Sequence, residues 1–326
     1  MSANVGDGSH RINITNGLLL YYNHYSFYSQ KVVMALHEKR LNFESNIINI
    51  MKGGQYEPWF LQINPRGEVP VLQDDAKIIP DSNRIIDYLE DNFSNGDTPR
   101  LIPLDQGSEI RQKVNYFRNI IDEIPANVVT IGSFFHPKLV DSPKIPFIAP
   151  VRRQMAAHER NTSKLLRTYA EKNLESREIL LQKAIAQDKK HLTITNLDEY
   201  LKLLDQVDNV LTKVEEELAK HVAENQSDWW LCSDRFTVAD IALTILLDRL
   251  NNIGLDTRFW AKGKRPHIER YYEKVKKRDS YKQTIPSKMF FFKMIFGQSP
   301  VFVGFSVVAL LSLMIGGVFV VKKYII

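Results

Sequence analysis

GEVPVLQDDAKIIPDS, residues 67–82, decides the fold of the first third of this 326-residue chain. Pro70 would remove a hydrogen-bond donor from a central strand, so we expect a cis-proline turn that exposes the backbone of Val69. Residues 69–72 and 77–79 have the length and composition of two short strands. Asp81 and Ser82 then open a helix, where either side chain can act as a cap. The stretch therefore predicts a strand pair that leads directly into a helix.

Strand and helix patterns alternate on either side of this stretch, through residues 17–94. Residues 18–22 (LLLYY) form an apolar run of strand length, and residues 42–50 alternate between apolar and polar side chains. Helical patterns cover residues 30–40, residues 57–63 and the segment from Ile85 to Phe93. The order is strand, helix, strand, helix, strand, strand, helix. It predicts an α/β unit, a small mixed sheet covered by helices.

Helical patterns replace strands after Gly107. Residues 109–129 and 197–221 are long and amphipathic, and residues 236–241 (FTVADI) have the form of a capping box. We therefore expect an all-helical domain over residues 105–283. Prolines interrupt residues 136–150, and the charged helical stretch that follows contains few large apolar residues. This insertion, about residues 136–196, is expected to project as an arm rather than join the core.

The end of the chain predicts a membrane anchor. Residues 301–321 (VFVGFSVVALLSLMIGGVFVV) carry no charge, and a helix of this length spans about 31 Å, enough to cross a bilayer. Residues 1–16 are expected to be a flexible terminus without a signal core. Residues 286–299 are basic and aromatic, and we expect them to lie at the membrane interface. The chain thus predicts a single C-terminal transmembrane helix with the body in the cytosol.

Composition narrows the classes of function. Cys232 is the single cysteine, so no intrachain disulfide and no CxxC motif can form. The histidines lack metal-binding spacing, and we expect no metal site. Residues 138–190 carry 12 Lys and Arg against 6 Asp and Glu, and residues 262–293 carry 11 against 3. In a membrane-anchored protein, an anionic membrane or an acidic protein fits these basic stretches better than nucleic acid.

Together these motifs resemble the glutathione transferase superfamily. The GEVPVL and PDS motifs, followed by the FTVAD box, are similar to a thioredoxin-like N-terminal domain joined to an all-helical C-terminal domain. With its long insertion and C-terminal span, the chain resembles the ganglioside-induced differentiation-associated protein family. The resemblance implies a mitochondrial outer-membrane anchor, a peroxisomal share, homodimers and a role in mitochondrial fission. It also implies contact between the basic insertion and the acidic tails of tubulin.

The resemblance also implies a thiol-activating hydroxyl at the start of the first helix. Ser26 aligns with that position, where the positive helix end and a donated hydrogen bond lower the pKa of a bound thiol. Ser26 can equally serve as a plain helix cap. Tyr22 is the competing candidate if the chemistry follows the tyrosine-type classes. Phe27 and Tyr28 replace the Ser-Cys pair of zeta-class enzymes, which puts isomerase chemistry in doubt.

Glutathione, as ligand or co-substrate, is the molecule that the resemblance implies, and no other cofactor is expected. The Val69 backbone, beside Pro70, can receive an extended thiol peptide as an added strand. Asp81 and Ser82 can bind a γ-glutamyl group through an ammonium partner and helix amides, or can simply cap the helix.

Lys52 and Gln55 are candidates for the glycine end of glutathione. The leading hypothesis is a regulator of mitochondrial dynamics that binds ligands or partners. The alternatives are a working transferase that uses Ser26 on hydrophobic electrophiles, and a zeta-type isomerase.

Overall fold

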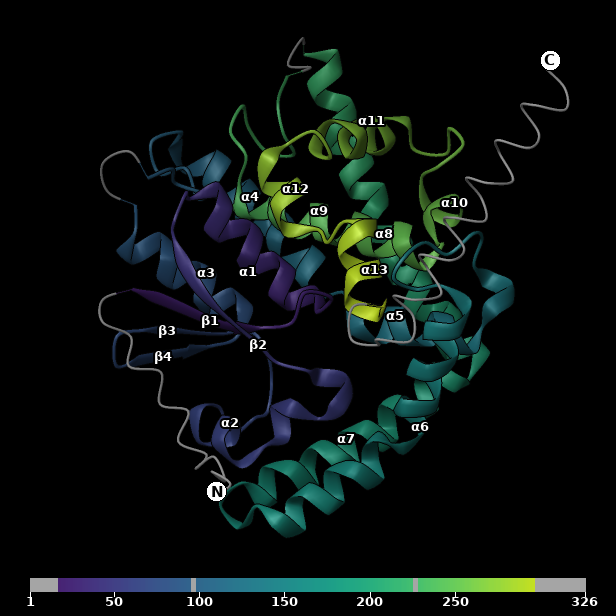
Figure 1. The fold of residues 1–326 in the computed structure, drawn as a ribbon. Coiled ribbons are helices and arrows are strands. Elements are labelled where there is room, and N and C mark those ends of the chain that lie inside the picture. Colours follow the sequence, from purple (N-terminus) through teal and green to yellow (C-terminus); the bar gives the residue numbers. More distant parts are fainter. Residues whose placement is uncertain (1–16, 95–97, 225–227, 297–326) are drawn as a thin grey trace, which may run out of the picture. The chain divides into compact units, whose positions relative to one another are not determined.

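The computed structural model describes residues 17–94, 98–224 and 228–296 (Figure 1). The chain divides into two compact units, residues 1–285 and 286–326. The first unit contains four strands, β1 (Leu18–Tyr22), β2 (Phe43–Ile47), β3 (Val71–Asp74) and β4 (Lys77–Pro80). Its α-helices are α1 (Phe27–Glu38), α2 (Pro58–Ile63), α3 (Ser82–Asn92), α4 (Gly107–Asp122), α5 (Ala126–Phe135), α6 (Ala149–Lys172), α7 (Arg177–Thr195), α8 (Leu197–Ala223), α9 (Val238–Ile253), α10 (Asp256–Phe259), α11 (Pro266–Val275) and α12 (Asp279–Thr284). Four short 3-10 helices are η1 (Ile50–Lys52), η2 (Gly54–Tyr56), η3 (Pro137–Leu139) and η4 (Leu174–Ser176).

The four strands form one mixed sheet in the order β2-β1-β3-β4. β1 runs parallel to β2 and antiparallel to β3, and β3 pairs with β4 in a hairpin. Every residue of β1 is buried because both faces of the sheet are covered: α1 and α3 lie on one face and α2 on the other (Figure 1). Leu18 and Leu20 pack on the α1 side, and Leu19 and Tyr21 on the α2 side. The predicted α/β unit and its element order are confirmed.

The Val69–Pro70 peptide bond is cis, as residues 67–72 predicted. β3 begins at Val71 rather than at Val69. Pro70 has no N–H to donate to the sheet, so regular pairing starts only after it.

A buried ion pair joins the end of α1 to the linker between the domains. Lys39 is 1% exposed, and its ammonium group lies 2.6 Å from a carboxylate oxygen of Glu90 on α3. Glu90 also accepts hydrogen bonds from the backbone amides of Leu101 and Ile102. Lys39 donates to the carbonyl of Pro99 in turn. The linker is thereby held against the C-terminal end of α1.

Helix α9 lies at the centre of the helical part and is buried on almost every face. Its predicted capping box is present: the Asp240 carboxylate accepts from the Thr237 amide at 2.8 Å. The other Asp240 oxygen accepts from the Leu231 amide and the Tyr271 hydroxyl. Burial raises the pKa of Asp240, and these hydrogen bonds oppose the rise. The box is therefore a structural element of the core, as expected from residues 236–241.

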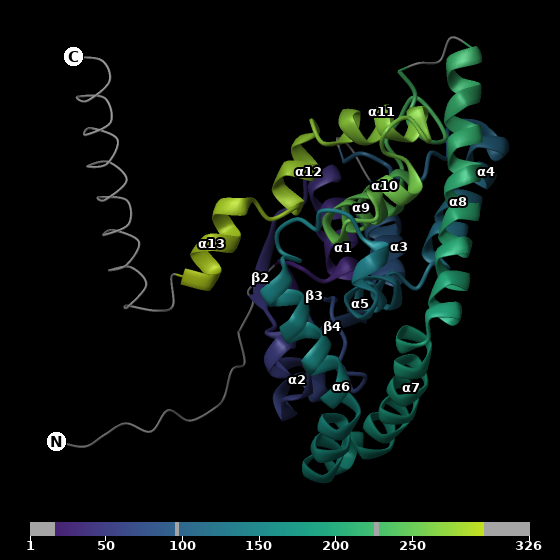
Figure 2. The ribbon, with the colours of Figure 1, turned by 90° about the vertical axis from the view of Figure 1, so that its right-hand side faces the viewer.

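The insertion differs from the expectation that it would stand apart from the core. Its two helices, α6 and α7, form a hairpin, hereafter the arm, that lies alongside α2 (Figures 1 and 2). A separate small apolar cluster joins the arm to the N-terminal domain. Its members are Tyr56, Leu61, Leu166, Ala170, Leu180 and Ala184. The arm's members of this cluster, Leu166 with Ala170 and Leu180 with Ala184, are spaced by four residues, which places each pair on one helical face. That narrow stripe is enough to dock the arm on the N-terminal domain.

The proline-rich entry to the arm also departs from that expectation. Phe147 is buried in the main core, and the Asp141 amide donates to the carbonyl of Gly254 at the end of α9. Gly254 has a φ of +82° and approaches Asp141 so closely that no side chain would fit there.

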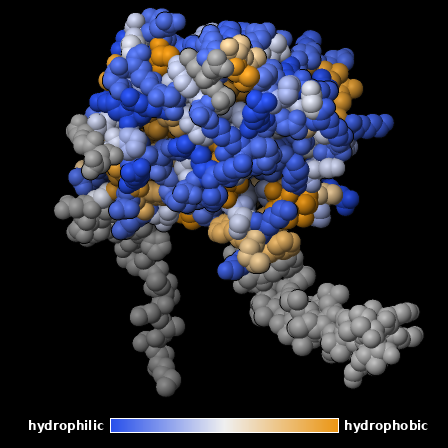
Figure 3. Space-filling model, turned by 90° about the horizontal axis from the view of Figure 1, so that it is seen from above, coloured by the Kyte–Doolittle hydropathy of each residue, from blue (hydrophilic) through white to orange (hydrophobic). Residues whose placement is uncertain are grey.

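The second unit contains one described helix, α13 (Lys288–Phe296), in which Met289, Phe290 and Phe292 are exposed. The transmembrane helix expected at residues 301–321 lies outside the described residues, as does the terminus 1–16. Within residues 17–94, 98–224 and 228–296, no helix is both long and apolar enough to cross a bilayer. The face of the molecule in Figure 3 is largely hydrophilic, with apolar side chains in small separate groups.

Candidate functional site

The strand register brings the predicted site residues to one edge of the sheet. Tyr21 near the end of β1 pairs with Val71 at the start of β3, and Val71 pairs with Pro80 at the end of β4. The segments that leave or enter these strand ends carry Ser26, Val69 and Asp81. We call this group, with Gln55 from the loop after β2, the sheet-edge site.

Ser26 caps helix α1. Its backbone is extended, with φ −71° and ψ 123°, and its hydroxyl oxygen accepts a hydrogen bond from the Ser29 amide at 3.3 Å. This bond uses an oxygen lone pair and leaves the hydroxyl proton available to a bound thiolate. The capping role is therefore present, and it is compatible with the activating role.

Tyr22, the competing candidate, is buried at the end of β1. Its hydroxyl lies 3.3 Å from Nδ1 of His24, and the two rings meet edge to face. Burial raises the pKa of Tyr22, so its hydroxyl stays protonated at neutral pH. Tyr22 is engaged inside the chain, whereas Ser26 lies at the helix end.

Tyr28 was noted in the sequence only as a departure from zeta-class enzymes. Its half-buried ring contacts Phe27, with 5.3 Å between ring centroids. Burial raises the pKa of Tyr28 most, Asp122 raises it further, and Arg249 lowers it. Glu68 and Asp81 add smaller upward effects, so the phenol lies within the electrostatic reach of the sheet-edge site. In the sequence, the only sign of a role for Tyr28 was its place beside Phe27, where zeta-class enzymes have Ser-Cys.

The backbone of Val69 is available for pairing. Among the residues that the structure describes, neither its amide nor its carbonyl has a backbone hydrogen-bond partner. Beside the cis bond to Pro70, this backbone can accept an added strand.

Asp81 caps α3 in an unusual conformation. Its φ is +77°, and its carboxylate accepts from the amides of Asn83 and Arg84 at 3.0 and 3.1 Å. Non-glycine residues rarely adopt a positive φ, although aspartate tolerates it better than most. Ser82 follows as the first helical residue and is buried. Asp81 therefore caps the helix, which was one of its two expected roles. Its other expected role, binding a γ-glutamyl group, stays a prediction.

Lys52 and Gln55 lie in the two short helices η1 and η2 after β2. Lys52 is exposed. The side-chain oxygen of Gln55 is buried, and within the described part of the chain it has no hydrogen-bond partner. Gln55 is therefore the better candidate of the two for contact with a ligand.

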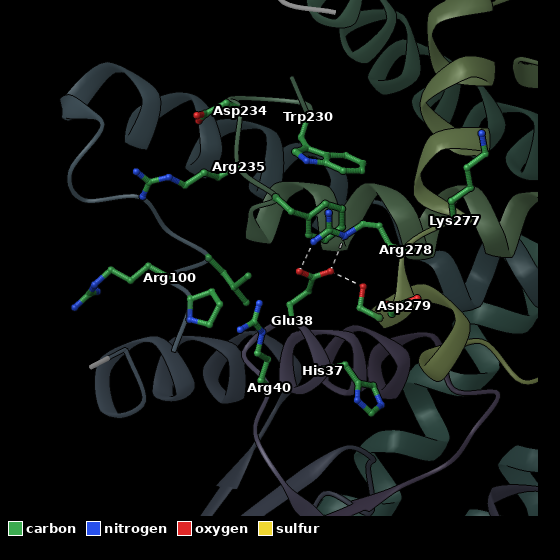
Figure 4. Close-up of a pocket in the computed structure, with 14 residues that line it drawn as sticks. His37, Glu38, Arg40, Arg100, Trp230, Asp234, Arg235, Lys277, Arg278 and Asp279 are labelled. Atoms are coloured by element: carbon green, nitrogen blue, oxygen red, sulfur yellow. Dashed lines mark hydrogen bonds and ion pairs between the residues drawn. The ribbon is translucent and has the colours of Figure 1, made fainter. Parts of the chain in front are cut away.

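A cavity of about 750 Å³ opens at the other end of α1 (Figure 4). Helix α1 has 12 residues, so this α1-end cavity lies about 18 Å from Ser26 along the helix axis. Its lining comes from α1, the interdomain linker, the segment before α9 and the start of α12. The lining residues are His37, Glu38, Arg40, Pro99, Arg100, Leu101, Trp230, Asp234, Arg235, Phe236, Lys277, Arg278, Asp279 and Ser280.

Glu38 and Arg278 are in direct contact in the lining of the α1-end cavity (Figure 4). The Arg278 guanidinium donates to both Glu38 oxygens, at 2.8 and 2.6 Å, and the Ser280 hydroxyl donates to the same carboxylate. Arg278 also stacks over Trp230 and Phe236, at 4.8 and 4.3 Å from the ring centroids. These contacts fix one wall of the cavity.

The remaining charges make the α1-end cavity electropositive. Arg235 pairs with Asp105 outside the cavity, and Asp279 pairs with Lys282. Three cations of the lining have no ion-pair partner among the described residues: Arg40, Arg100 and Lys277. Only one carboxylate of the lining, Asp234, lacks such a partner within the same described residues. Cations without a local counter-charge attract anions.

His37 does not add to this positive charge at neutral pH. Burial lowers the pKa of His37, and the neighbouring Glu38 carboxylate only partly offsets that effect.

The α1-end cavity was not predicted from the sequence, although one signal was present. The basic segment 262–293 contains both Lys277 and Arg278, and we assigned its charge to the membrane interface. Arg278 contacts Glu38, 240 residues earlier in the chain, and also Trp230 and Phe236, some 40 to 50 residues earlier. Only folding brings these residues together. No group of three or more His, Cys, Asp or Glu side chains that could hold a metal lies in the described ranges.

Two family models match the chain. The model of the glutathione S-transferase N-terminal domain matches residues 20–97, and that of the C-terminal domain matches residues 180–279. The unmatched residues between them, 98–179, include the whole of the arm's first helix, α6.

The chain is similar to characterised proteins of this superfamily. It is 32% identical to the human ganglioside-induced differentiation-associated protein 1-like 1 over 273 residues, 82% of this chain and 73% of that protein. It is 27% identical to the Arabidopsis thaliana glutathione S-transferase TCHQD, over 82% of this chain and 88% of that protein.

Among solved structures, the beta-etherase LigF of Sphingobium matches with a TM-score of 0.60 at 23% identity, over 82% of this chain and 98% of that one. That similarity shows the shared fold. The chain belongs to the ganglioside-induced differentiation-associated protein family of the glutathione transferase superfamily.

Proposed function

We propose that this protein is a tail-anchored, glutathione-transferase-like protein of the mitochondrial outer membrane, with a peroxisomal share, that regulates mitochondrial fission by binding ligands or partners. The position of the α1-end cavity carries the regulatory part of this proposal. The cavity opens at the opposite end of α1 from Ser26. A ligand bound there is remote from the hydroxyl that would activate a thiol. Its binding would therefore regulate the protein without a catalytic step at Ser26.

The ligand of the α1-end cavity is anionic. Arg40, Arg100 and Lys277 outnumber Asp234 once the internal ion pairs are set aside. Citrate and inorganic phosphate are suitable probes of this charge. The full chain in detergent should bind at least one of them in calorimetry, and a double variant with Arg40→Gln and Lys277→Gln should bind it roughly tenfold more weakly.

Lys202→Gln provides the matched control, because Lys202 is an exposed lysine in an ordinary surface ion pair on α8. Equal anion binding by the control, the double variant and the wild type would exclude the cavity as the site. In cells that lack the protein, the wild type should restore mitochondrial length and the double variant should not. Restoration by both would contradict the regulatory role of the cavity.

The apolar segment 301–321, flanked by Lys322 and Lys323, supports the mitochondrial location. Residues 286–326 fused to a fluorescent protein should label mitochondria, with some label on peroxisomes. Reticular staining would refute the assignment.

The arm supports a contact with acidic protein tails, such as those of tubulin. Arg153, Lys164 and Lys189 are exposed on its two helices. Replacing all three with Gln should weaken co-sedimentation with microtubules and should have less effect at high salt. Unchanged co-sedimentation would remove this partner.

A second candidate function is glutathione transfer at the sheet-edge site, with Ser26 as the activator. The unpaired backbone of Val69 favours it. Calorimetry of the full chain with glutathione tests it, and Ser26→Ala should abolish thiol conjugation while leaving glutathione bound. Failure of the wild type to bind glutathione would remove this function.

A further inference from the structure

The arm reaches the sheet-edge site at the loop that carries Gln55. A Cβ atom added to Gly53 would lie 2.7 Å from the hydroxyl oxygen of Tyr169 on α6. The Tyr169 ring also packs on Tyr56, with 5.5 Å between centroids. The phenol of Tyr169 therefore lies directly against the backbone between Lys52 and Gln55.

A second contact places the arm beside Val69. Lys183 of α7 forms an ion pair with Glu68, the residue immediately before Val69. The Glu68 carbonyl is held in turn by the Asn64 side chain at 2.9 Å. The arm thus contacts both segments that flank one end of the sheet-edge site, although it is more than one hundred residues away in sequence.

Two polar groups at this end lack partners. The side-chain oxygen of Gln55 is buried without a donor, and the Tyr169 hydroxyl makes no hydrogen bond with any residue that the structure describes. A buried acceptor without a donor is costly, and a ligand N–H would relieve that cost. The Tyr169 phenol lies against Gly53, two residues before Gln55, and a phenol can donate a hydrogen bond to a carboxylate. An N–H followed by a carboxylate is the chemistry of a peptide C-terminus.

We propose that Tyr169 binds the C-terminal carboxylate of a thiol peptide held at the sheet-edge site, so that the arm forms part of that site. Gln55 accepts the last peptide N–H, and the Tyr169 hydroxyl donates to the terminal carboxylate. The inference rests on the second candidate function, that this site binds glutathione.

Calorimetry of the full chain in detergent tests this assignment with glutathione and its glycine ethyl ester. The wild type should bind glutathione about tenfold more tightly than the ester, the change expected for one hydrogen bond to a charged group. Tyr169→Phe should lose that tenfold preference, with little effect on the affinity for the ester.

Gly53→Ala tests whether the site depends on the position of the arm, and Gly263→Ala is its matched control. Both glycines have a similar φ, +77° and +79°, but an added Cβ meets Tyr169 only at Gly53 and meets nothing within 4 Å at Gly263. Gly53→Ala should increase hydrogen exchange in the arm and remove the preference for glutathione over its ester. Gly263→Ala should leave both unchanged.

The outcomes separate the two claims. If the wild type binds glutathione and Tyr169→Phe keeps the full preference for it over the ester, the role of Tyr169 is wrong and the second candidate function stands. If the wild type does not bind glutathione, both are wrong, and the proposal for the α1-end cavity is unaffected.

Discussion

Glu38 is the side chain on which the α1-end cavity depends. Its carboxylate is 9% exposed and accepts from both Arg278 and Ser280. Replacing it with Gln keeps the volume but removes the charge, which leaves the stacked guanidinium without its counter-charge. We expect a loss of roughly 1–3 kcal/mol in the free energy of unfolding, measured by urea denaturation.

Glu199→Gln is the control for this prediction, because the Glu199–Lys202 pair is exposed and one helical turn apart. It should cost less than about 0.5 kcal/mol. Equal costs for the two variants would show that the Glu38–Arg278 pair contributes no more than a surface pair.

His37 makes stability depend on pH. Burial lowers its pKa, against a smaller upward effect of Glu38, so the folded protein binds fewer protons there than the unfolded chain does. Stability therefore falls as the pH falls through the ordinary histidine range, near about 6.5, and down to the lowered pKa. His37→Gln should reduce the loss of stability between pH 7.5 and pH 5.5, measured by urea denaturation at each pH. The same pH slope in both proteins would contradict this assignment.

At the scale of elements, the packing of α5 against α8 requires a glycine. A Cβ atom added to Gly132 would lie 2.3 Å from the ring of Tyr200, which is fully buried and donates to the carbonyl of Val129 at 2.8 Å. Gly132→Ala should therefore destabilise the protein by about 1–3 kcal/mol in thermal or urea unfolding, despite the better helix propensity of alanine.

Gly132→Ala in a Tyr200→Leu background tests whether the steric clash with the Tyr200 ring causes the loss of stability. With the ring removed, Gly132→Ala should be neutral or stabilising, because only the gain in helix propensity remains. A cost that persists in this background would mean that the ring is not its cause.

The elements differ in how well the sequence predicted them. The predicted order of strands and helices in residues 17–94 is correct because β1 is wholly apolar and its neighbours have clear periods. The α9 capping box is correct because Thr237 and Asp240 lie within one turn of each other. The docking of the arm was not predicted, because Leu166, Ala170, Leu180 and Ala184 form a stripe too narrow to distinguish from a solvated helix face.

For the whole molecule, the described apolar clusters draw their members from residues 18–285. Among the described residues, none beyond Ile285 belongs to the three clusters of buried apolar residues, and the unit boundary follows Ile285. A chain ending at Ile285 should therefore unfold in a single cooperative transition, with the near-ultraviolet circular dichroism of the full protein. A broad, non-cooperative transition would show that residues 286–326 contribute to the core.

The sequence alone determined the features that depend on neighbouring residues: the element order, the cis turn at Pro70 and the capping box of α9. Local periodicity, backbone restriction and hydrogen bonds within one turn are sufficient for these. The sequence left Ser26 and Asp81 open between a helix cap and a ligand contact, and the structure shows the caps. Only the tertiary structure decided the α1-end cavity, where Glu38 meets Arg278, and the contact of Tyr169 with Gly53. The partners in these contacts are separated by more than one hundred residues, and a charge or a phenol carries no local pattern that identifies a partner so distant in the chain.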